Sequence, residues 1–267
     1  MSKQLWFYNN NYAMLGVIRG EGNVGKTGIV FLPGLGQTKA GIYFLFSQIA
    51  MELESDFVTL QFDYTGFGDS EGEMEECNLE KLLSDSKKAI ELFAEKMFCK
   101  EIILIGMGIG NIIAAQCAKI LSVVKGIILL SPYKNCLNSY QEFEELIKRI
   151  KDSFEVLDTA ELGDWDRENF VNEFFVLLGA GMHRNKGLLI RKEFLLEISE
   201  VNLEKLIIQS GKTVLLVQAE NEKRNIYNVE MKKIFFKKSD AKLQDPDDRN
   251  IIINEIKGWI KNRGWEK

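Results

Sequence analysis

Short apolar runs alternate with amphipathic stretches along most of the chain, and this alternation predicts the order of its elements. Runs that are apolar throughout are typical of strands buried on both faces, whereas apolar residues that recur every three or four positions indicate helices. Strands are expected at Gly28–Leu32, Phe57–Phe62, Glu101–Ile105, Val124–Leu130, Thr213–Gln218 and Met231–Lys237. Helices are expected at Ala40–Met51, Leu79–Met97, Ile112–Val123 and Arg249–Lys261. This order predicts an α/β fold with a mostly parallel central sheet and helices on both faces.

The N-terminal segment has a different pattern. Two β-type runs, Leu5–Tyr8 and Tyr12–Arg19, flank the turn-forming cluster Asn9-Asn10-Asn11. Asparagine tolerates the left-handed backbone that tight hairpin turns require. We therefore expect the chain to open with an antiparallel hairpin.

The alternation stops between Tyr133 and Gly211. This segment is rich in charged and aromatic residues and has helical patterns at Tyr140–Ile150 and Arg167–Leu178. Its charged positions are expected to form solvated helix faces. We predict that residues 1–132 and 212–267 form one α/β core and that residues 133–211 form a helical insertion.

Composition and charge narrow the classes of function. The chain has 267 residues, of which 46% are hydrophobic and 27% are charged, so it can bury the core of one α/β domain. Its 34 basic and 39 acidic residues give a net charge of −5 and form no basic stripe, so we expect no nucleic-acid partner. No apolar run reaches the roughly 18 residues of a membrane span, and Met1–Asn10 lacks the order of a signal peptide. We expect a cytoplasmic location.

Cysteine and histidine usage argues against a metal site. The cysteines form no C-x-x-C pair, and they lie mostly in apolar surroundings, as reduced thiols do: Cys77, Cys99, Cys117 and Cys136. The chain has a single histidine, His183, which does not favour a zinc site built from Cys and His. We expect neither a metal nor another cofactor.

A glycine-rich turn follows the strand Glu101–Ile105. Its sequence, Gly106-Met107-Gly108-Ile109-Gly110, resembles the G-x-S-x-G nucleophile elbow of α/β-hydrolases, in which a strained turn presents the attacking serine above the sheet. Both outer glycines are present. Gly108 stands at the serine position and has no side chain that could attack a substrate.

Two further motifs carry the same resemblance. Leu32-Pro33-Gly34-Leu35-Gly36 is similar to the H-G-x-G oxyanion loop of the family, and the segment Asp63–Gly72 is similar to its D-x-x-G-x-G-x-S-x-G motif. The motifs occur in the family's order and most resemble its serine aminopeptidase and acylglycerol-lipase-like branch. The resemblance implies an α/β-hydrolase fold, and it implies that residues 133–211 form the family's helical cap, which covers the pocket.

The resemblance also implies positions for the rest of a Ser-His-acid triad. Glu222 lies at the expected place of the acid, and Lys242 lies nearest the expected place of the histidine. An exposed lysine is protonated at neutral pH, so it is no base unless burial depresses its pKa. His183 lies within the predicted cap, where a lone histidine is more often a loop or surface residue than a catalytic base. We therefore predict a degenerate triad, with Gly108, Glu222 and Lys242 at its positions.

An oxyanion pocket can persist without the nucleophile. In the family, backbone N–H groups from the residue after the nucleophile and from the first loop hold the oxyanion. The matching residues are Ile109 and Leu35, with Gly34 and Met107 beside them. Alternatively, Met107, Ile109 and aromatic residues of the cap fill the cavity.

Two classes of function remain open. We predict a pseudohydrolase that binds a small acyl-type ligand or a protein partner. The alternative is a hydrolase or acyltransferase that acts on ester, thioester or amide substrates with relocated catalytic residues. Cys117 lies about two helical turns beyond the elbow, which favours a buried structural thiol, and neither Ser70 nor Ser131 has a base beside it in the sequence. The sequence leaves the ligand, the partner and the oligomeric state open.

Overall fold

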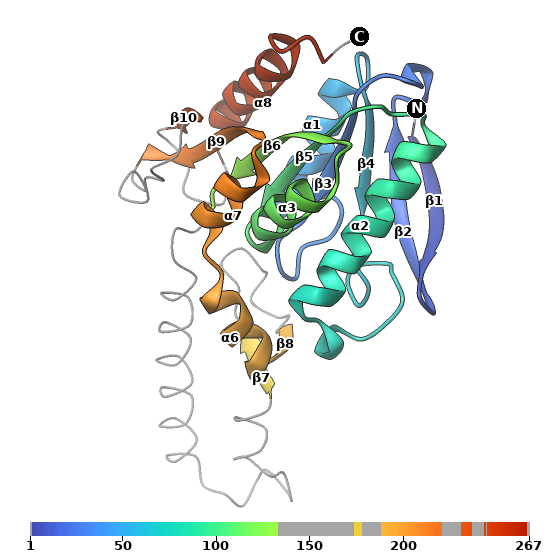
Figure 1. Cartoon of the computed structure of the whole chain (residues 1–267), viewed down its shortest axis with the longest axis vertical. Helices are drawn as coiled ribbons and strands as arrows, with labels where there is room; N and C mark the ends of the chain where they lie inside the picture. Colours follow the sequence, from blue (N-terminus) through green and yellow to red (C-terminus); the bar gives the residue numbers. More distant parts are fainter. Residues whose placement is uncertain are drawn as a thin grey trace, which may run out of the picture.

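One eight-stranded sheet organises the molecule (Figure 1). The computed structural model describes residues 2–132, 174–177, 188–220, 231–236, 243 and 245–265. The strands of the sheet are β1 (Ser2–Asn9), β2 (Tyr12–Arg19), β3 (Gly28–Leu32), β4 (Val58–Phe62), β5 (Ile102–Met107), β6 (Val124–Leu130), β9 (Thr213–Ala219) and β10 (Lys232–Phe236). Their spatial order is β1-β2-β4-β3-β5-β6-β9-β10. β2 pairs antiparallel with both β1 and β4, and every other neighbouring pair of this sheet is parallel, so the predicted mostly parallel sheet is confirmed.

The N-terminal hairpin forms as the asparagine cluster predicts. Asn9 pairs with Tyr12 across a two-residue turn, and Asn10 adopts a left-handed φ of 52°. An asparagine accepts this conformation more readily than most residues because its short polar side chain bonds locally. β2 then pairs with β4, which joins the hairpin to the parallel part of the sheet.

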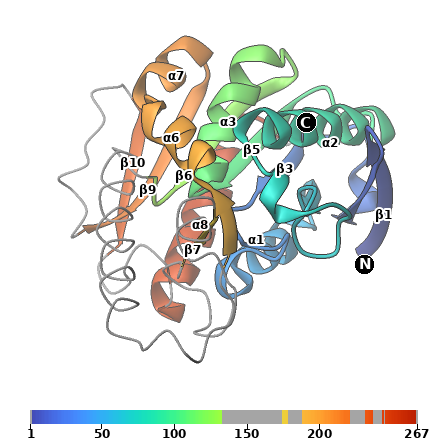
Figure 2. The same cartoon turned by 90° about the horizontal axis from the view of Figure 1, so that it is seen from below.

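Two helix layers enclose the sheet, and Figure 2 shows the sheet between them. One layer contains α2 (Leu79–Lys96), α3 (Ile109–Ile120) and α7 (Leu203–Ser210); the other contains α1 (Leu45–Leu53) and α8 (Pro246–Lys261). Alternate side chains of β3 pack against the two layers. Val30 and Leu32 belong to the hydrophobic cluster under α2 and α3, while Ile29 and Phe31 belong to the cluster under α1 and α8. Period-two alternation of buried side chains is the reason that the central strands are apolar throughout.

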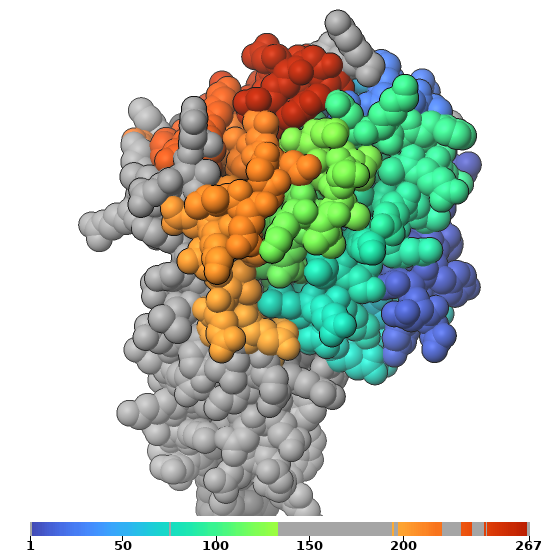
Figure 3. Space-filling model, in the orientation of Figure 1, coloured from blue at the N-terminus to red at the C-terminus, as the bar shows by residue number. Residues whose placement is uncertain are grey.

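Helix α7 lies within the range predicted for the insertion but packs with the core. Leu203 and Ile207 are buried in the same hydrophobic cluster as Ile112 and Ile113 of α3. Figure 3 shows the two helices side by side on one face of the molecule. Helix α6 (Lys192–Glu200) precedes α7 and contributes the buried Phe194 to this cluster.

A strand replaces part of a predicted helix. Phe174–Leu177 forms β7, which pairs antiparallel with β8 (Leu188–Arg191), so the helical prediction for Arg167–Leu178 is wrong over these residues. Aromatic and β-branched residues fit a pleated strand, and a paired strand outweighs a local helical periodicity. The other predicted helix of this region, Tyr140–Ile150, lies outside the described residues.

The helix starts differ from the sequence-based boundaries for local reasons. α1 begins at Leu45, because Tyr43 and Phe44 before it adopt left-handed φ values of 47° and 61° and interrupt the apolar pattern from Ala40. α8 begins at Pro246, and Asp245 caps it by accepting hydrogen bonds from the first-turn backbone N–H groups. A proline at the first position and an acidic cap are both favourable at a helix start.

Candidate functional site

The candidate site lies at the carboxyl edge of the sheet, where β5 turns into α3. Gly108 makes this turn with φ 56° and ψ −124°, a conformation that glycine adopts freely and other residues adopt under strain. A Cβ atom at this position would meet only the Cα of Gly34, at 3.4 Å. The turn therefore has room for a side chain, and the cost of adding one lies in the backbone conformation.

The outer glycines of the turn bring three backbone segments into contact. A Cβ on Gly110 would lie 1.9 Å from the carbonyl oxygen of Leu32, at the end of β3. A Cβ on Gly106 would lie 2.5 Å from the carbonyl oxygen of Gly110. Glycine at both positions allows α3 to start directly against β5 and β3, as the elbow motif implies.

The loop after β3 lies beside the elbow. Gly34 approaches Gly108 and donates its N–H to Oε1 of Gln37 at 3.1 Å. Among the described residues, no acceptor is found for the backbone N–H of Leu35 or of Ile109. The fold thus brings together the loop and elbow residues that the sequence singled out, with two backbone donors unused.

The side chains that flank Gly108 are packed in the core. Met107 is 5% exposed and belongs to the cluster under α1 and α8, whereas Ile109 is 7% exposed and belongs to the cluster under α2 and α3. Leu35 is partly buried against the latter cluster. These side chains anchor the turn from both faces of the sheet, and the backbone between them faces the candidate site.

Comparison with known proteins decides the family. A model of the alpha/beta hydrolase family matches residues 29–196, which include the loop, the Asp63–Gly72 segment and the elbow. The chain belongs to this family. No curated protein matches it by sequence.

Solved structures of other alpha/beta hydrolases share the fold. Est1E from Butyrivibrio proteoclasticus with ferulic acid bound has a TM-score of 0.68 and 16% identity, over 97% of this chain and 98% of that one. Alpha/beta hydrolase domain-containing protein 10 from mouse has a TM-score of 0.64 and 17% identity, over 97% and 99% of the two chains. The DcsB complex with its substrate analogue has a TM-score of 0.69 and 15% identity, over 98% and 99%. At these identities the likeness establishes the fold.

Buried polar side chains with unused hydrogen-bonding atoms lie at the same edge of this hydrolase fold. Asn111, in the first turn of α3, donates to the carbonyl oxygen of Leu130 at 3.1 Å but leaves its own Oδ1 without a partner. Ser131 follows β6 and Gln218 lies near the end of β9; the Ser131 hydroxyl and both amide atoms of Gln218 also have no partner among the described residues. Buried polar atoms without partners also occur elsewhere in the described residues, for example at Thr59, Gln116 and Trp259, and the three side chains at this edge offer theirs beside the elbow.

An ion cluster of Lys39, Asp63 and Asp69 lies next to the loop that follows β3. Asp63 is fully buried, and its carboxylate accepts from Nζ of Lys39 at 2.6 Å and from the N–H of Asp69 at 3.0 Å. Lys39 also contacts Oδ2 of Asp69 at 2.5 Å. Burial acts to lower the pKa of Lys39, but the hydrogen bonds and charges of the two carboxylates outweigh it, and the pKa is raised. The sequence indicated the Asp63 motif but not its partner Lys39.

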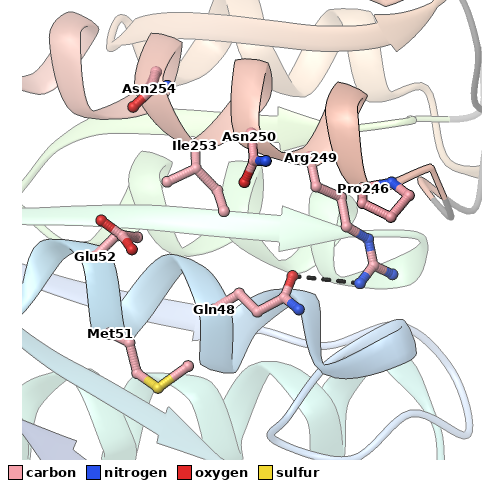
Figure 4. A pocket seen from close by; sticks show the side chains of 8 residues that line it. All are labelled: Gln48, Met51, Glu52, Pro246, Arg249, Asn250, Ile253 and Asn254. Carbon is pink, nitrogen blue, oxygen red and sulfur yellow. Dashed lines mark hydrogen bonds between the residues drawn. The ribbon is translucent and has the colours of Figure 1, made fainter.

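A buried cation, Arg249, joins two segments on the α1 and α8 face. Arg249 lies at one end of a groove of about 420 Å³ between these helices (Figure 4). Its guanidinium donates to the carbonyl oxygens of Leu243 and Tyr43, at 2.5 and 2.9 Å, and to Oε1 of Gln48 at 3.3 Å. Burial lowers the pKa of Arg249. Helical periodicity placed Arg249 at a helix start and carried no signal of these contacts.

Ser70 finds little support as a substitute nucleophile. The Ser70 hydroxyl donates to the carbonyl oxygen of Asp63 at 2.8 Å and accepts from the N–H of Leu15 at 3.0 Å, so it is engaged in loop structure.

Within the described ranges, no group of three or more His, Cys, Asp or Glu residues could hold a metal ion, and no helix has the length and apolar character to cross a membrane. Glu222, Lys242 and His183 lie outside the described residues.

The buried thiols are expected to be unreactive in the folded protein. Burial raises the pKa of Cys77 and Cys117 to about 12 and that of Cys99 to about 11. Since the thiolate is the nucleophile, iodoacetamide at mildly alkaline pH should leave all three unmodified in native buffer and alkylate them in urea, as peptide mapping would show. Preferential alkylation of Cys117 in the native protein would contradict this and favour a relocated thiol nucleophile.

Proposed function

We propose that this alpha/beta hydrolase has a degenerate triad and acts as a binding protein for a small acyl-type ligand that carries a carbonyl or carboxylate oxygen. The observation that carries the proposal is the elbow itself: glycine occupies the serine position, while the elbow keeps a positive φ of 56°. Removing the nucleophile ends acyl transfer at this position without altering the backbone donors around it.

The unused backbone donors support an oxygen-binding role. The N–H groups of Leu35 and Ile109 have no acceptor among the described residues, and Ile109 is the first residue of α3. The N-terminus of a helix attracts negative charge, and its free N–H groups bind oxyanions. The unpartnered atoms of Asn111, Ser131 and Gln218 provide further polar contacts at the same edge. Est1E, which shares the fold, binds ferulic acid in its solved structure.

The proposal includes several finer assignments. Glu222 and Lys242 occupy the acid and histidine positions of the degenerate triad, and the predicted insertion, residues 133–211 apart from α7, forms the cap over the ligand. The protein belongs to the serine aminopeptidase and acylglycerol-lipase-like branch and works in the cytoplasm. A protein partner that inserts an acidic or carbonyl group into the same pocket is the alternative occupant.

A donor-deletion variant tests the binding role. Ile109→Pro removes one N–H at the first position of α3, where proline is well tolerated. Ile109→Ala is the matched control, because it removes the same side chain and keeps the N–H. Calorimetry with short- and medium-chain carboxylates should detect binding to wild type and to Ile109→Ala, and a loss of about tenfold or more in Ile109→Pro. Equal affinity in both variants, or no binding to wild type, would count against the proposed site.

Restoring the serine should not restore catalysis. Gly108→Ser places a side chain on a backbone with φ 56°, so we expect a loss of about 1–3 kcal/mol in the free energy of unfolding. Gly108→Ala should lose a similar amount, because the strain comes from the backbone and not from the hydroxyl. Urea unfolding measures both. Ester turnover that appears only in Gly108→Ser would reveal a working base and overturn the degenerate-triad proposal.

The second candidate function is a hydrolase or acyltransferase with relocated catalytic residues. The retained elbow favours it, and so do the N–H groups of Leu35 and Ile109, which have no acceptor among the described residues, because such parts stabilise an oxyanion during acyl transfer. Intact-mass measurement after fluorophosphonate treatment, combined with a panel of chromogenic acyl esters, distinguishes the two. We expect neither adduct nor turnover. A stoichiometric adduct with turnover would establish the enzyme, and peptide mapping would locate its nucleophile.

A further inference from the structure

The outer edge of the sheet at β1 is an open strand edge. β1 pairs only with β2, and Figure 1 shows no described element beyond it. Its eight residues pair with β2 in continuous register from Ser2 to Asn9, without a bulge. The strand contains no proline, and Lys3 is its only charged residue. Apart from Lys3, it therefore lacks the devices by which most edge strands avoid pairing with another chain.

The hydrogen-bonding pattern identifies the groups that face outward. Odd-numbered residues of β2 point away from β1: the N–H groups of Ala13 and Leu15 donate to Glu71 and Ser70, and the carbonyl oxygen of Leu15 accepts from Asp63. Even-numbered residues of β2 consequently bond to β1. Because each of them lies opposite an odd-numbered residue of β1, the even-numbered residues of β1 direct their N–H and C=O groups outward. These residues are Ser2, Gln4, Trp6 and Tyr8.

Two of these residues carry exposed aromatic side chains. Trp6 is 54% exposed and Tyr8 is 65% exposed, whereas Phe7 between them is 5% exposed on the opposite face of the sheet. Large aromatic side chains beside free backbone donors and acceptors are typical of a surface that pairs with another strand.

We propose that β1 pairs antiparallel with β1 of a second copy of this chain, about a two-fold axis that passes beside Trp6. In this register Trp6 lies opposite Trp6 of the second copy, and Gln4 lies opposite Tyr8 of the second copy. Each opposed pair exchanges two backbone hydrogen bonds, since all three residues turn their groups outward. The side chains of opposed residues share one face, so the aromatic rings form a continuous row across the axis.

The charges of β1 and the area it can bury are both compatible with pairing between two copies. The register places Lys3 opposite Asn9 of the second copy, so the two lysines stay apart and no acidic residue of β1 enters the interface. An aromatic side chain buries about 150–250 Å² when fully covered. Two copies of Trp6 and Tyr8, already partly covered, together with two backbones bury at most about 1,000 Å², the lower limit of a specific interface. The resulting dimer is weak and concentration-dependent.

Sedimentation velocity over a concentration series tests the dimer. Wild type should shift from monomer to dimer as its concentration rises, and the double variant Trp6→Lys/Tyr8→Lys should stay monomeric. The matched control is Ile208→Lys on α7, which charges a similarly exposed apolar side chain (61%) on another face and should leave the dimer intact. A monomeric wild type at every concentration, or a dimer that persists in the double variant, would overturn the proposal.

Hydrogen exchange on the wild-type protein provides a test that needs no variant. The amides of Gln4, Trp6 and Tyr8 should gain protection as the concentration rises, because pairing occupies them. The amides of Leu5 and Phe7, which already bond to β2, should change little. Unchanged exchange at the three even-numbered amides while the protein dimerises would assign the dimer to another surface.

Discussion

Gly110→Ala is expected to remove a large part of the stability of the protein. The new Cβ would lie 1.9 Å from the carbonyl oxygen of Leu32, 2.7 Å from its carbonyl carbon and 2.9 Å from the carbonyl oxygen of Pro33. All three atoms belong to the backbone at the end of a central strand, so no side chain can move aside, and α3 must separate from β3. We expect a loss of about 4–5 kcal/mol, a large part of the stability of a typical domain, measured by urea unfolding with circular dichroism.

Gly258→Ala is the matched control for this prediction. Gly258 lies within α8, where a Cβ would meet nothing within 4 Å. Alanine favours a helix over glycine by about 0.8–1 kcal/mol, so this variant should be slightly more stable than wild type. A cost below about 1 kcal/mol for Gly110→Ala would show that the elbow helix has freedom to shift, and the close-packing argument would fail.

Asp63→Ala is expected to have the next largest effect. Asp63 is fully buried and accepts from both the backbone N–H and Nζ of Lys39, as well as from the N–H of Asp69. Its removal leaves Lys39 with one exposed carboxylate partner and leaves two backbone donors without acceptors. Each donor left without an acceptor costs about 1–3 kcal/mol, so we expect a loss of about 2–5 kcal/mol in urea unfolding at neutral pH.

Asp69→Ala distinguishes the contribution of the buried carboxylate, Asp63, from that of the exposed carboxylate, Asp69, to the ion cluster with Lys39. The Asp69 side chain is 64% exposed, so its ion pair with Lys39 is screened by water and should contribute less than about 1 kcal/mol. Similar losses in the two variants would show that the contribution of Asp63 does not come from burial. Because Lys39 follows the loop that contains Gly34 and Leu35, Asp63→Ala should also speed hydrogen exchange in this loop, whereas Asp69→Ala should not.

Local periodicity correctly predicted the elements whose structure is determined by residues close to one another in the sequence. The apolar runs of the central strands and the Asn9-Asn10-Asn11 turn gave the sheet and the hairpin. The elbow glycines predicted the strand-to-helix turn from the sequence alone, because the motif they form has a fixed backbone geometry in the family. Boundaries failed where a special backbone intervened, as at Tyr43 and Phe44, whose left-handed φ values delay the start of α1.

The sequence by itself determined the order of strands and helices, the alpha/beta hydrolase resemblance and the glycine at the serine position. Only the tertiary structure decided that Phe174–Leu177 is a strand, that Lys39 neutralises Asp63, and that Arg249 joins the loops at Tyr43 and Leu243. The physical reason is the range of the interactions. Helix periodicity and turn chemistry act over a few neighbouring residues, whereas strand pairing and the burial of charges depend on partners that the fold brings together from distant parts of the chain.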